Sequence, residues 1–251
     1  INHILFKKYW MLKMSNKTMP LHQEAWIEEL AIKIFNEIEA LTKDKVGVSR
    51  ESYGKGENIS INYMIDLAKE FGFYIEKDAA ANVYLSLEQS IKNNHILIGS
   101  HIDSVPQGGN FDGLAGVIAG FLILVYLKEK KVKTSLPIKL LVLRGEESAW
   151  YGKNCIGSKA LFGLISQEDL NSTHRSNGKK LSKAMTESGV KLDQIRKCKT
   201  LINKNEIEAF IEIHIEQGPI LVDKNWPIAI VTGIRGNYRH HKIRCKGTAG
   251  H

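Results

Sequence analysis

The fold of this chain is decided by residues 95–145, HILIGSHIDSVPQGGNFDGLAGVIAGFLILVYLKEKKVKTSLPIKLLVLRG. The stretch opens with a short apolar run at 95–100 and closes with a second at 136–145, and both have the length and composition of buried strands. Between them, a glycine-rich loop at 107–113 leads into a segment at 114–130 that is apolar nearly all round, as a buried helix is. Strand, helix and strand, all buried, predict a parallel α/β core.

The segments on either side of this core show the periodicities of further helices and strands. The elements expected outside the core are a helix over 21–41, a Gly/Ser loop over 47–58, a second helix over 61–71, a strand pair joined around 78–82, a polar helical region over 164–204 and a strand over 207–218. From Pro219, strand-like segments alternate with turns and predict an antiparallel sheet. We therefore expect a basic tail over 1–20, an α/β domain over 21–218 and the beginning of a second domain over 219–251.

Composition excludes several classes of protein. The 251 residues are 43% hydrophobic and 25% charged, which is ordinary for a soluble globular protein and excludes disorder, collagen and coiled coils. The three cysteines are widely spaced and odd in number, so they fit a reducing cytoplasm and not a disulfide framework. No run approaches the ~20 apolar residues of a membrane span. We expect a cytoplasmic protein with no membrane partner.

The net charge of +8 is spread unevenly along the chain. Basic residues concentrate in 1–17, 179–204 and 235–246. A nucleic-acid binder usually places such charge along one face, with aromatic residues interleaved. None of the motifs needs that partner, and we expect no nucleic-acid binding.

Histidine and acidic residues follow the expected core strands. His101 and Asp103 come after the first strand, Glu146 and Glu147 after the second, and His214 lies in the strand over 207–218. Ligands of open α/β sheets bind outside the carboxyl ends of the strands. Imidazoles with carboxylates suit Zn²⁺, Mn²⁺ or Co²⁺. The sequence therefore favours a metal site at this rim.

Each residue also has a plain structural interpretation. His101 and Asp103 could form a hydrogen-bonded surface pair, and Asp112, which precedes the apolar helix, could be its N-cap. The two glutamates could occupy a solvated turn, and His214 could face solvent or pack. Only their joint placement at strand ends supports a metal site.

Three segments, in this order and spacing, resemble the M20-type metallohydrolases. They are GSHIDSVPQGGNFDGLAGVIAG (99–120), RGEESAWYGKNCIGSKALFG (144–163) and IEIHIEQGPIL (211–221). Within that family the similarity is to the branch of N-carbamoyl-L-amino acid hydrolase, β-ureidopropionase and allantoate amidohydrolase, and it runs from about Leu21 to His251. It implies a Zn-exopeptidase-like α/β domain, with a mostly parallel mixed sheet flanked by helices, followed by the start of an α+β lid and dimerisation domain.

The resemblance also implies roles for the metal ligands. His101 and His214 match the ligands of one metal, and Asp112 matches the carboxylate that bridges two metals. Glu147 matches a ligand of the second metal. Asp103 matches the carboxylate that orients the His101 imidazole. The implied cofactors are thus two divalent ions, Zn or Mn/Co.

Three further positions match residues that act on the substrate. Glu146 matches the general base, and Gln217 resembles a position that contacts the substrate. His251 matches a histidine of the lid domain that reaches the active site of the partner subunit and polarises the scissile carbonyl. The resemblance therefore implies a homodimer.

The implied activity is hydrolysis of a linear, non-peptide C–N bond in a small N-carbamoyl or ureido acid. An M20 aminoacylase or dipeptidase, and a non-catalytic truncated remnant, are the alternatives. The chain reads EESAWY at 146–151 where the family often reads EEGSRF, which weakens the case for any one named substrate. The family's remaining metal ligand, a late histidine, lies beyond residue 251. We therefore expect an incomplete second metal site and an inactive fragment.

Overall fold

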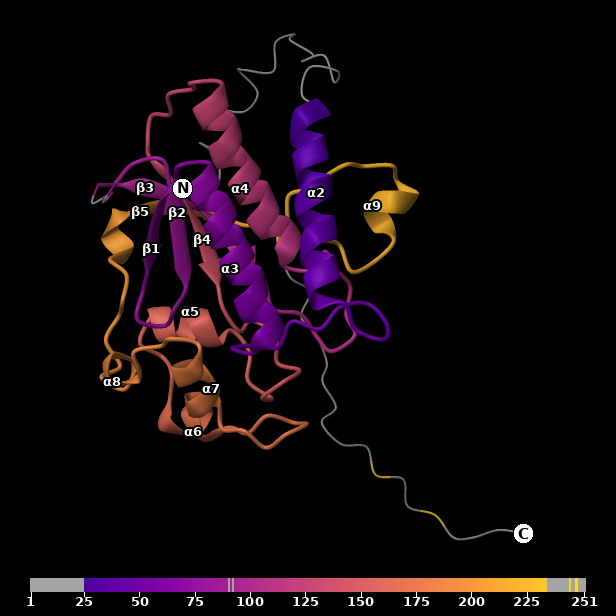
Figure 1. Ribbon diagram of the computed structural model, residues 1–251, viewed down its shortest axis with the longest axis vertical. Coiled ribbons are helices and arrows are strands. Elements are labelled where there is room, and N and C mark those ends of the chain that lie inside the picture. Colours follow the sequence, from indigo (N-terminus) through magenta and orange to yellow (C-terminus); the bar gives the residue numbers. More distant parts are fainter. Residues whose placement is uncertain (1–24, 90, 92, 234–243, 245–246, 248–251) are drawn as a thin grey trace. The chain divides into compact units, whose positions relative to one another are not determined.

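The computed structural model describes residues 25–89, 91, 93–233, 244 and 247. The chain divides into two units, one ending at Ile215 and the other beginning at Glu216. The first unit is built on a five-stranded sheet (Figure 1). Its strands, in the order in which they lie across the sheet, are β1 (Tyr74–Lys77), β2 (Val83–Ser86), β4 (Ile138–Leu143), β3 (His95–His101) and β5 (Ile207–Ile211).

The centre of the sheet is parallel, as the sequence predicts. Strand β3 pairs in parallel with β4 on one side and with β5 on the other, so that Ile98 lies opposite both Leu140 and Ile211. Strands β1 and β2 add an antiparallel pair at the far edge, and β2 is also antiparallel to β4. The sheet is therefore mixed, and the carboxyl ends of β3 and β4 lie side by side.

Helices of the first unit cover both faces of the sheet. They are α2 (Ala25–Thr42), α3 (Lys55–Glu70), α4 (Leu114–Glu129), α5 (Ile156–Leu161), α6 (Gln167–Asn171), α7 (Leu181–Glu187) and α8 (Leu192–Ile195), with a 3-10 turn η2 (Lys204–Glu206). The first three pack against one face in a single hydrophobic cluster. On the other face, Tyr84, Leu97 and Leu141 pack with Leu161 of α5.

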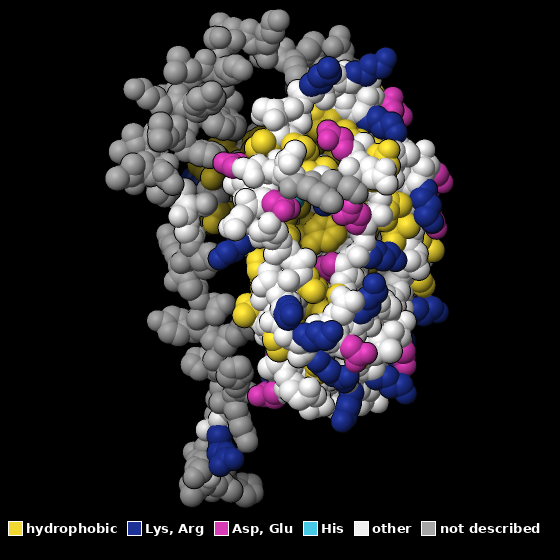
Figure 2. Space-filling model, turned by 90° about the vertical axis from the view of Figure 1, so that its left-hand side faces the viewer, with side chains coloured by type: hydrophobic (Ala, Val, Ile, Leu, Met, Phe, Trp, Pro, Cys, Tyr) yellow, Lys and Arg dark blue, Asp and Glu magenta, His cyan; other side chains and the backbone are white. Residues whose placement is uncertain are grey.

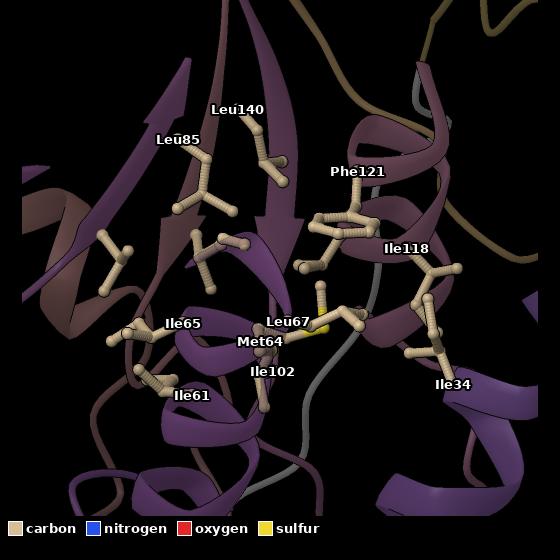
Figure 3. Close-up of a cluster of buried hydrophobic side chains, with 14 of the residues drawn as sticks. Ile34, Ile61, Met64, Ile65, Leu67, Leu85, Ile102, Ile118, Phe121 and Leu140 are labelled. Carbon is tan, nitrogen blue, oxygen red and sulfur yellow. The ribbon is translucent and has the colours of Figure 1, made fainter. Parts of the chain in front are cut away.

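The main core lies between α2, α3, α4 and the sheet. Figure 3 shows Phe121 of α4 directed toward Leu140 of the sheet, and Ile118 of α4 directed toward Ile34 of α2. All four side chains are buried. Removing such a side chain from water contributes roughly 1.5–3 kcal/mol, and this burial holds the apolar helix α4 next to β3 and β4.

The second helix begins earlier than its periodicity predicts. We expected a helix over 61–71 after a loop, but α3 starts at Lys55. Glu57, in its first turn, is fully buried and its Oε2 accepts the backbone N–H of Tyr53 at 2.6 Å. Because tertiary contacts hold this polar first turn, apolar spacing could not reveal it.

The edge strand β5 ends earlier than predicted. The sequence alternates up to residue 218, but the strand stops at Ile211, where its pairing with Ile98 of β3 also stops. Strand β3 is the only neighbour that the described residues provide for β5. His214 therefore lies beyond the strand in irregular structure, and the prediction that it lies in a strand is wrong.

The described part of the second unit differs from the predicted antiparallel sheet. Residues 216–233 contain a short helix, α9 (Ile220–Asp223), and no strand. The Glu216 carboxylate accepts the Leu221 N–H at 2.7 Å, and the bond stabilises this turn. Most of 234–251 lies outside the described residues. The domain limits at 20 and 218 stay predictions.

The surface carries the basic segment expected from the sequence. In Figure 2, Lys and Arg side chains gather over the lower part of one face, at the level of α5–α8 in Figure 1. Lys183, Lys191 and Lys197 in this region are exposed. A search of the described residues for a helix able to cross a bilayer finds none with the necessary length and apolar character.

Gly99 provides a test of the tight spacing between β3 and β4. A Cβ at Gly99 would lie 1.9 Å from the Leu141 carbonyl oxygen. We expect Gly99→Ala to lower the free energy of unfolding by about 3 kcal/mol, because the two strands would have to separate. Urea denaturation measures this change. Gly109→Ala, where a Cβ would meet nothing within 4 Å, is the control, and an equal effect of both substitutions would contradict the packing described.

Candidate metal centre

His101 is the last residue of β3, and its imidazole is held from two sides. Nδ1 lies 3.2 Å from Asp103 Oδ1 and 3.0 Å from the Asp103 carbonyl oxygen. Nε2 lies 4.0 Å from Glu146 Oε2. Burial lowers the pKa of His101, but the hydrogen bond and charge of Asp103, with Glu146 and Glu147, raise it overall to about 9. Nδ1 is thus engaged by Asp103, and Nε2 is directed toward the acidic rim.

Only a glycine fits beside this imidazole at the start of α4. Gly113 has a φ of +65°, and a Cβ there would lie 2.4–2.6 Å from three atoms of the His101 ring. Gly113 is also the N-cap of α4, which has no side-chain cap. The interpretation of Asp112 as the N-cap of this helix is therefore wrong.

Asp103 connects the ends of β3 and β4. Its carboxylate is fully buried; Oδ2 accepts the Ser52 hydroxyl at 2.6 Å and the Glu147 N–H at 3.0 Å, and Oδ1 accepts the Glu146 N–H at 2.9 Å. Burial raises the pKa of Asp103, but the His101 contact and these hydrogen bonds lower it overall. A carboxylate held in this way orients the imidazole and places the two glutamates.

The two glutamates have different surroundings. The Glu146 side chain is 42% exposed, and its Oε1 accepts from the Cys155 thiol at 3.4 Å. Glu147 is half-buried, and burial, followed by the negative charge of Glu146, raises its pKa to about 7. Two adjacent carboxylates with further acids nearby form a region where a divalent cation would relieve the repulsion between like charges.

Asp112 and His214 form a second imidazole–carboxylate pair. His214 Nε2 lies 3.5 Å from Asp112 Oδ1, and His214 Nδ1 lies 2.7 Å from the Ile215 carbonyl oxygen. Asp112 is adjacent to Gly113, which touches the His101 ring. The irregular segment after β5 therefore still brings His214 to the loop that leads into α4.

These residues fit a divalent cation in the kind of donor they offer and in their position at strand ends. They stand as two pairs, since no three His, Cys, Asp or Glu side chains within the described ranges come together as a group that could hold a metal. Gln217 lies in the second unit and is exposed. His251 lies outside the described residues.

Sequence reasoning missed Arg50, a fully buried residue that supports the loop after β3. Its Nε donates to the Ile102 carbonyl at 2.6 Å, and its Nη1 and Nη2 donate to the Asn110 side chain and carbonyl at 2.9 and 3.1 Å. Burial lowers its pKa to about 10, against the opposing charges of Asp103 and Asp112. Nothing in the linear sequence links this arginine, in a Gly/Ser loop, to a segment more than fifty residues away.

Trp150 shows what one departure from the family pattern does. The side chain is buried, its Nε1 donates to the Ser104 carbonyl at 2.7 Å, and its ring stacks on His174 at 5.4 Å between centroids. The indole belongs to a second hydrophobic cluster. Its hydrogen bond therefore fixes Ser104, the residue after Asp103, to that cluster. In this chain the side chain at position 150 therefore packs in the protein interior.

The family profile and the similar proteins agree on the family of this chain. Residues 97–246 match the profile of Peptidase family M20/M25/M40. The chain is 35% identical to the N-carbamoyl-L-amino acid amidohydrolase of Geobacillus stearothermophilus, over 76% of this chain and 46% of that protein. It is 33% identical to the N-carbamoyl-L-amino-acid amidohydrolase of Pseudomonas sp. (strain NS671), over 84% of this chain and 50% of that protein.

The fold agrees as well. The crystal structure of a hydantoinase/carbamoylase family amidase from Burkholderia ambifaria has a TM-score of 0.68 and 23% identity, over 78% of this chain and 47% of that one. The chain spans about half the length of the curated relatives it matches. The resemblance to the carbamoylase branch is thus confirmed, and the profile covers more than half of the sequence. The chain belongs to Peptidase family M20/M25/M40.

Proposed function

We propose that this chain carries metal-binding and proton-transfer residues of a hydrolase that cuts linear, non-peptide C–N bonds. N-carbamoyl amino acids and related ureido acids are the proposed substrates, as the names of its relatives suggest. The observation that carries the proposal is the position of His101 between the buried Asp103 and the accessible Glu146 at the ends of β3 and β4. This arrangement places His101, as an oriented metal ligand, next to Glu146 as the base.

The proposed metal ligands are the residues of the two imidazole–carboxylate pairs and their neighbour Glu147. His101 and His214 would bind one divalent ion, Asp112 would lie between two ions, and Glu147 would bind the second. Bound Zn²⁺, Mn²⁺ or Co²⁺ polarises a carbonyl and makes water acidic enough to react near neutral pH. Asp103 keeps Nδ1 of His101 engaged, which leaves Nε2 for the metal.

Glu146 is the proposed general base and acid. Its exposed carboxylate takes a proton from water as the water oxygen bonds to the ureido carbon. It returns that proton to the leaving nitrogen as the C–N bond breaks. The leaving nitrogen belongs to the amino acid, and the ureido carbon remains as carbamate, which breaks down to CO₂ and ammonia. The N-carbamoyl amino acid and water thus yield the amino acid, CO₂ and ammonia.

The same proposal extends to the domains and to the second subunit. Residues 21–218 would supply the catalytic part, and 219–251 would begin a lid and dimerisation domain. Gln217 would contact the substrate. His251 would act on the carbonyl from the partner subunit of a homodimer.

Glu146→Gln tests the assignment of the base. The amide keeps the size of the side chain but cannot accept the proton, so in an otherwise complete enzyme kcat should fall by roughly 10²–10⁴-fold while bound metal is unchanged. Ammonia release from N-carbamoyl amino acids and elemental analysis of the metal-loaded protein measure the two quantities. Glu208→Gln, an exposed acid on β5, is the control. Turnover of Glu146→Gln at the rate of this control would refute the role.

Asp103→Asn tests the orientation of His101. An asparagine has one acceptor oxygen where Asp103 uses two, and the imidazole loses its carboxylate partner. Metal affinity should fall by about 10–100-fold, as measured by competition with a chelating dye. Asp66→Asn, which breaks an exposed pair with Lys69, should leave affinity unchanged. Equal affinities in the two variants would count against His101 as a ligand oriented by Asp103.

A further inference from the structure

Every backbone N–H from Arg144 to Glu147 donates to a buried side chain. The four hydrogen bonds run from Arg144 to Asn82 Oδ1 (3.0 Å), from Gly145 to Glu57 Oε1 (2.8 Å), from Glu146 to Asp103 Oδ1 (2.9 Å) and from Glu147 to Asp103 Oδ2 (3.0 Å). The three acceptor residues come from three distant parts of the sequence. The segment that carries the proposed base is therefore held by preformed acceptors.

The carbonyl side of the same segment is held as well. The N–H groups of residues 155, 156 and 157 donate to the carbonyl oxygens of residues 146, 145 and 144 at 2.9, 2.7 and 2.8 Å. In addition, the Cys155 thiol reaches Glu146 Oε1 at 3.4 Å. A change in the backbone at 145–146 would therefore move Cys155, and this thiol can report on the segment.

Glu57 has no place in the proposed chemistry, yet it is as fully buried as the other two acceptor residues. Its carboxylate is fully buried in the first turn of α3. Besides Gly145 it accepts from the Tyr53 N–H at 2.6 Å and from the Arg144 guanidinium, whose Nε lies 2.9 Å from Oε2. Arg144 in turn lies 4.6 Å from the centre of the Tyr53 ring. One carboxylate thus joins α3 to the end of β4.

We propose that Glu57 is a positioning residue for Glu146, which it directs by accepting the backbone N–H of the preceding residue, Gly145. The inference rests on the proposed function only in naming Glu146 as the base. Gly145 has a φ of +60°, so the chain turns between the Glu57 hydrogen bond and the Glu146 side chain. Without that acceptor the Gly145 N–H would be buried and unsatisfied, and the turn would shift to find a partner.

The alternative is that Glu57 serves only to neutralise Arg144. Removing one partner of a buried ion pair destabilises a protein even where no positioning is involved. The two roles differ in what they need from residue 57: neutralisation needs its charge, whereas positioning needs a hydrogen-bond acceptor. Glu57→Gln and Glu57→Met both lose the charge, but only Gln keeps an acceptor oxygen.

The test measures alkylation of Cys155 by iodoacetamide, followed by peptide mass spectrometry, in both variants at equal fractions of folded protein. The expected rate at Cys155 is about tenfold higher in Glu57→Met than in Glu57→Gln, because a lost buried hydrogen bond opens the segment. The exposed Cys198 should react equally in both variants. Equal rates at Cys155 would overturn the proposal.

A matched control lies on the same strand. Lys139 of β4, with a side chain only 9% exposed, pairs with Glu76 at 3.2 Å. Glu76, whose side chain is 44% exposed, pairs with this lysine away from the turn, and Glu76→Met should leave Cys155 reactivity unchanged. If Glu76→Met accelerates Cys155 as much as Glu57→Met does, the effect is general destabilisation and the proposal fails.

Kinetics give a second readout. Misplacement of the base by Glu57→Met should lower kcat by on the order of 10²-fold, leave KM unchanged, and be partly rescued in Glu57→Gln. If an enzyme of the relatives' full length that carries this chain, loaded with Zn²⁺, Mn²⁺ or Co²⁺, releases no ammonia from N-carbamoyl amino acids, the proposed function fails. Cys155 labelling still decides the positioning role.

If the single variants do not fold, the same comparison is made in chains that also carry Arg144→Met. Replacing both members of a buried ion pair with apolar residues is much less destabilising than removing one. Glu57→Met with Arg144→Met should still label Cys155 about tenfold faster than Glu57→Gln with Arg144→Met. Equal labelling would again reject the proposal.

Discussion

The buried carboxylate of Asp103 is the interaction on which the candidate site depends. A fully buried charge is tolerated only where hydrogen bonds and charged partners surround it, and Asp103 obtains them from Ser52, His101 and the N–H groups of Glu146 and Glu147. These partners come from the loop before α3 and from the ends of β3 and β4. Satisfying one carboxylate therefore brings three separate segments to one rim of the sheet.

The hydrophobic core makes that arrangement possible. Parallel pairing of β3 with β4 places His101 beside Leu143 at the same end of the sheet, while α4 packs on one face through residues such as Phe121. The start of α4 can approach His101 only because residue 113 is glycine. Packing thus brings the start of α4 next to the end of β3, while Arg50 holds the backbone after β3 and Glu57 holds the backbone after β4 by hydrogen bonds.

The sequence predicted most of the central fold and the histidines and acids that follow its strands. The apolar runs at 95–100 and 136–145 are β3 and β4, and the apolar segment after Gly113 is α4. Strand ends were therefore recognisable, as were the acids and histidines that follow them. The predictions were wrong for the start of α3, the end of β5 and the described part of 219–251. In these places the conformation depends on individual polar contacts or on the lack of a second neighbouring strand among the described residues.

What the sequence by itself determined was the order of elements, the family and the residues that reach the rim, because apolar periodicity and motif spacing are local properties. Only the tertiary structure decided how those residues are held. Glu57 and Asn82 accept N–H groups of the turn before Glu146 from positions more than sixty residues away. Such acceptors have no periodic signal, since a buried polar residue is selected by the partner it meets in space and not by its neighbours along the chain.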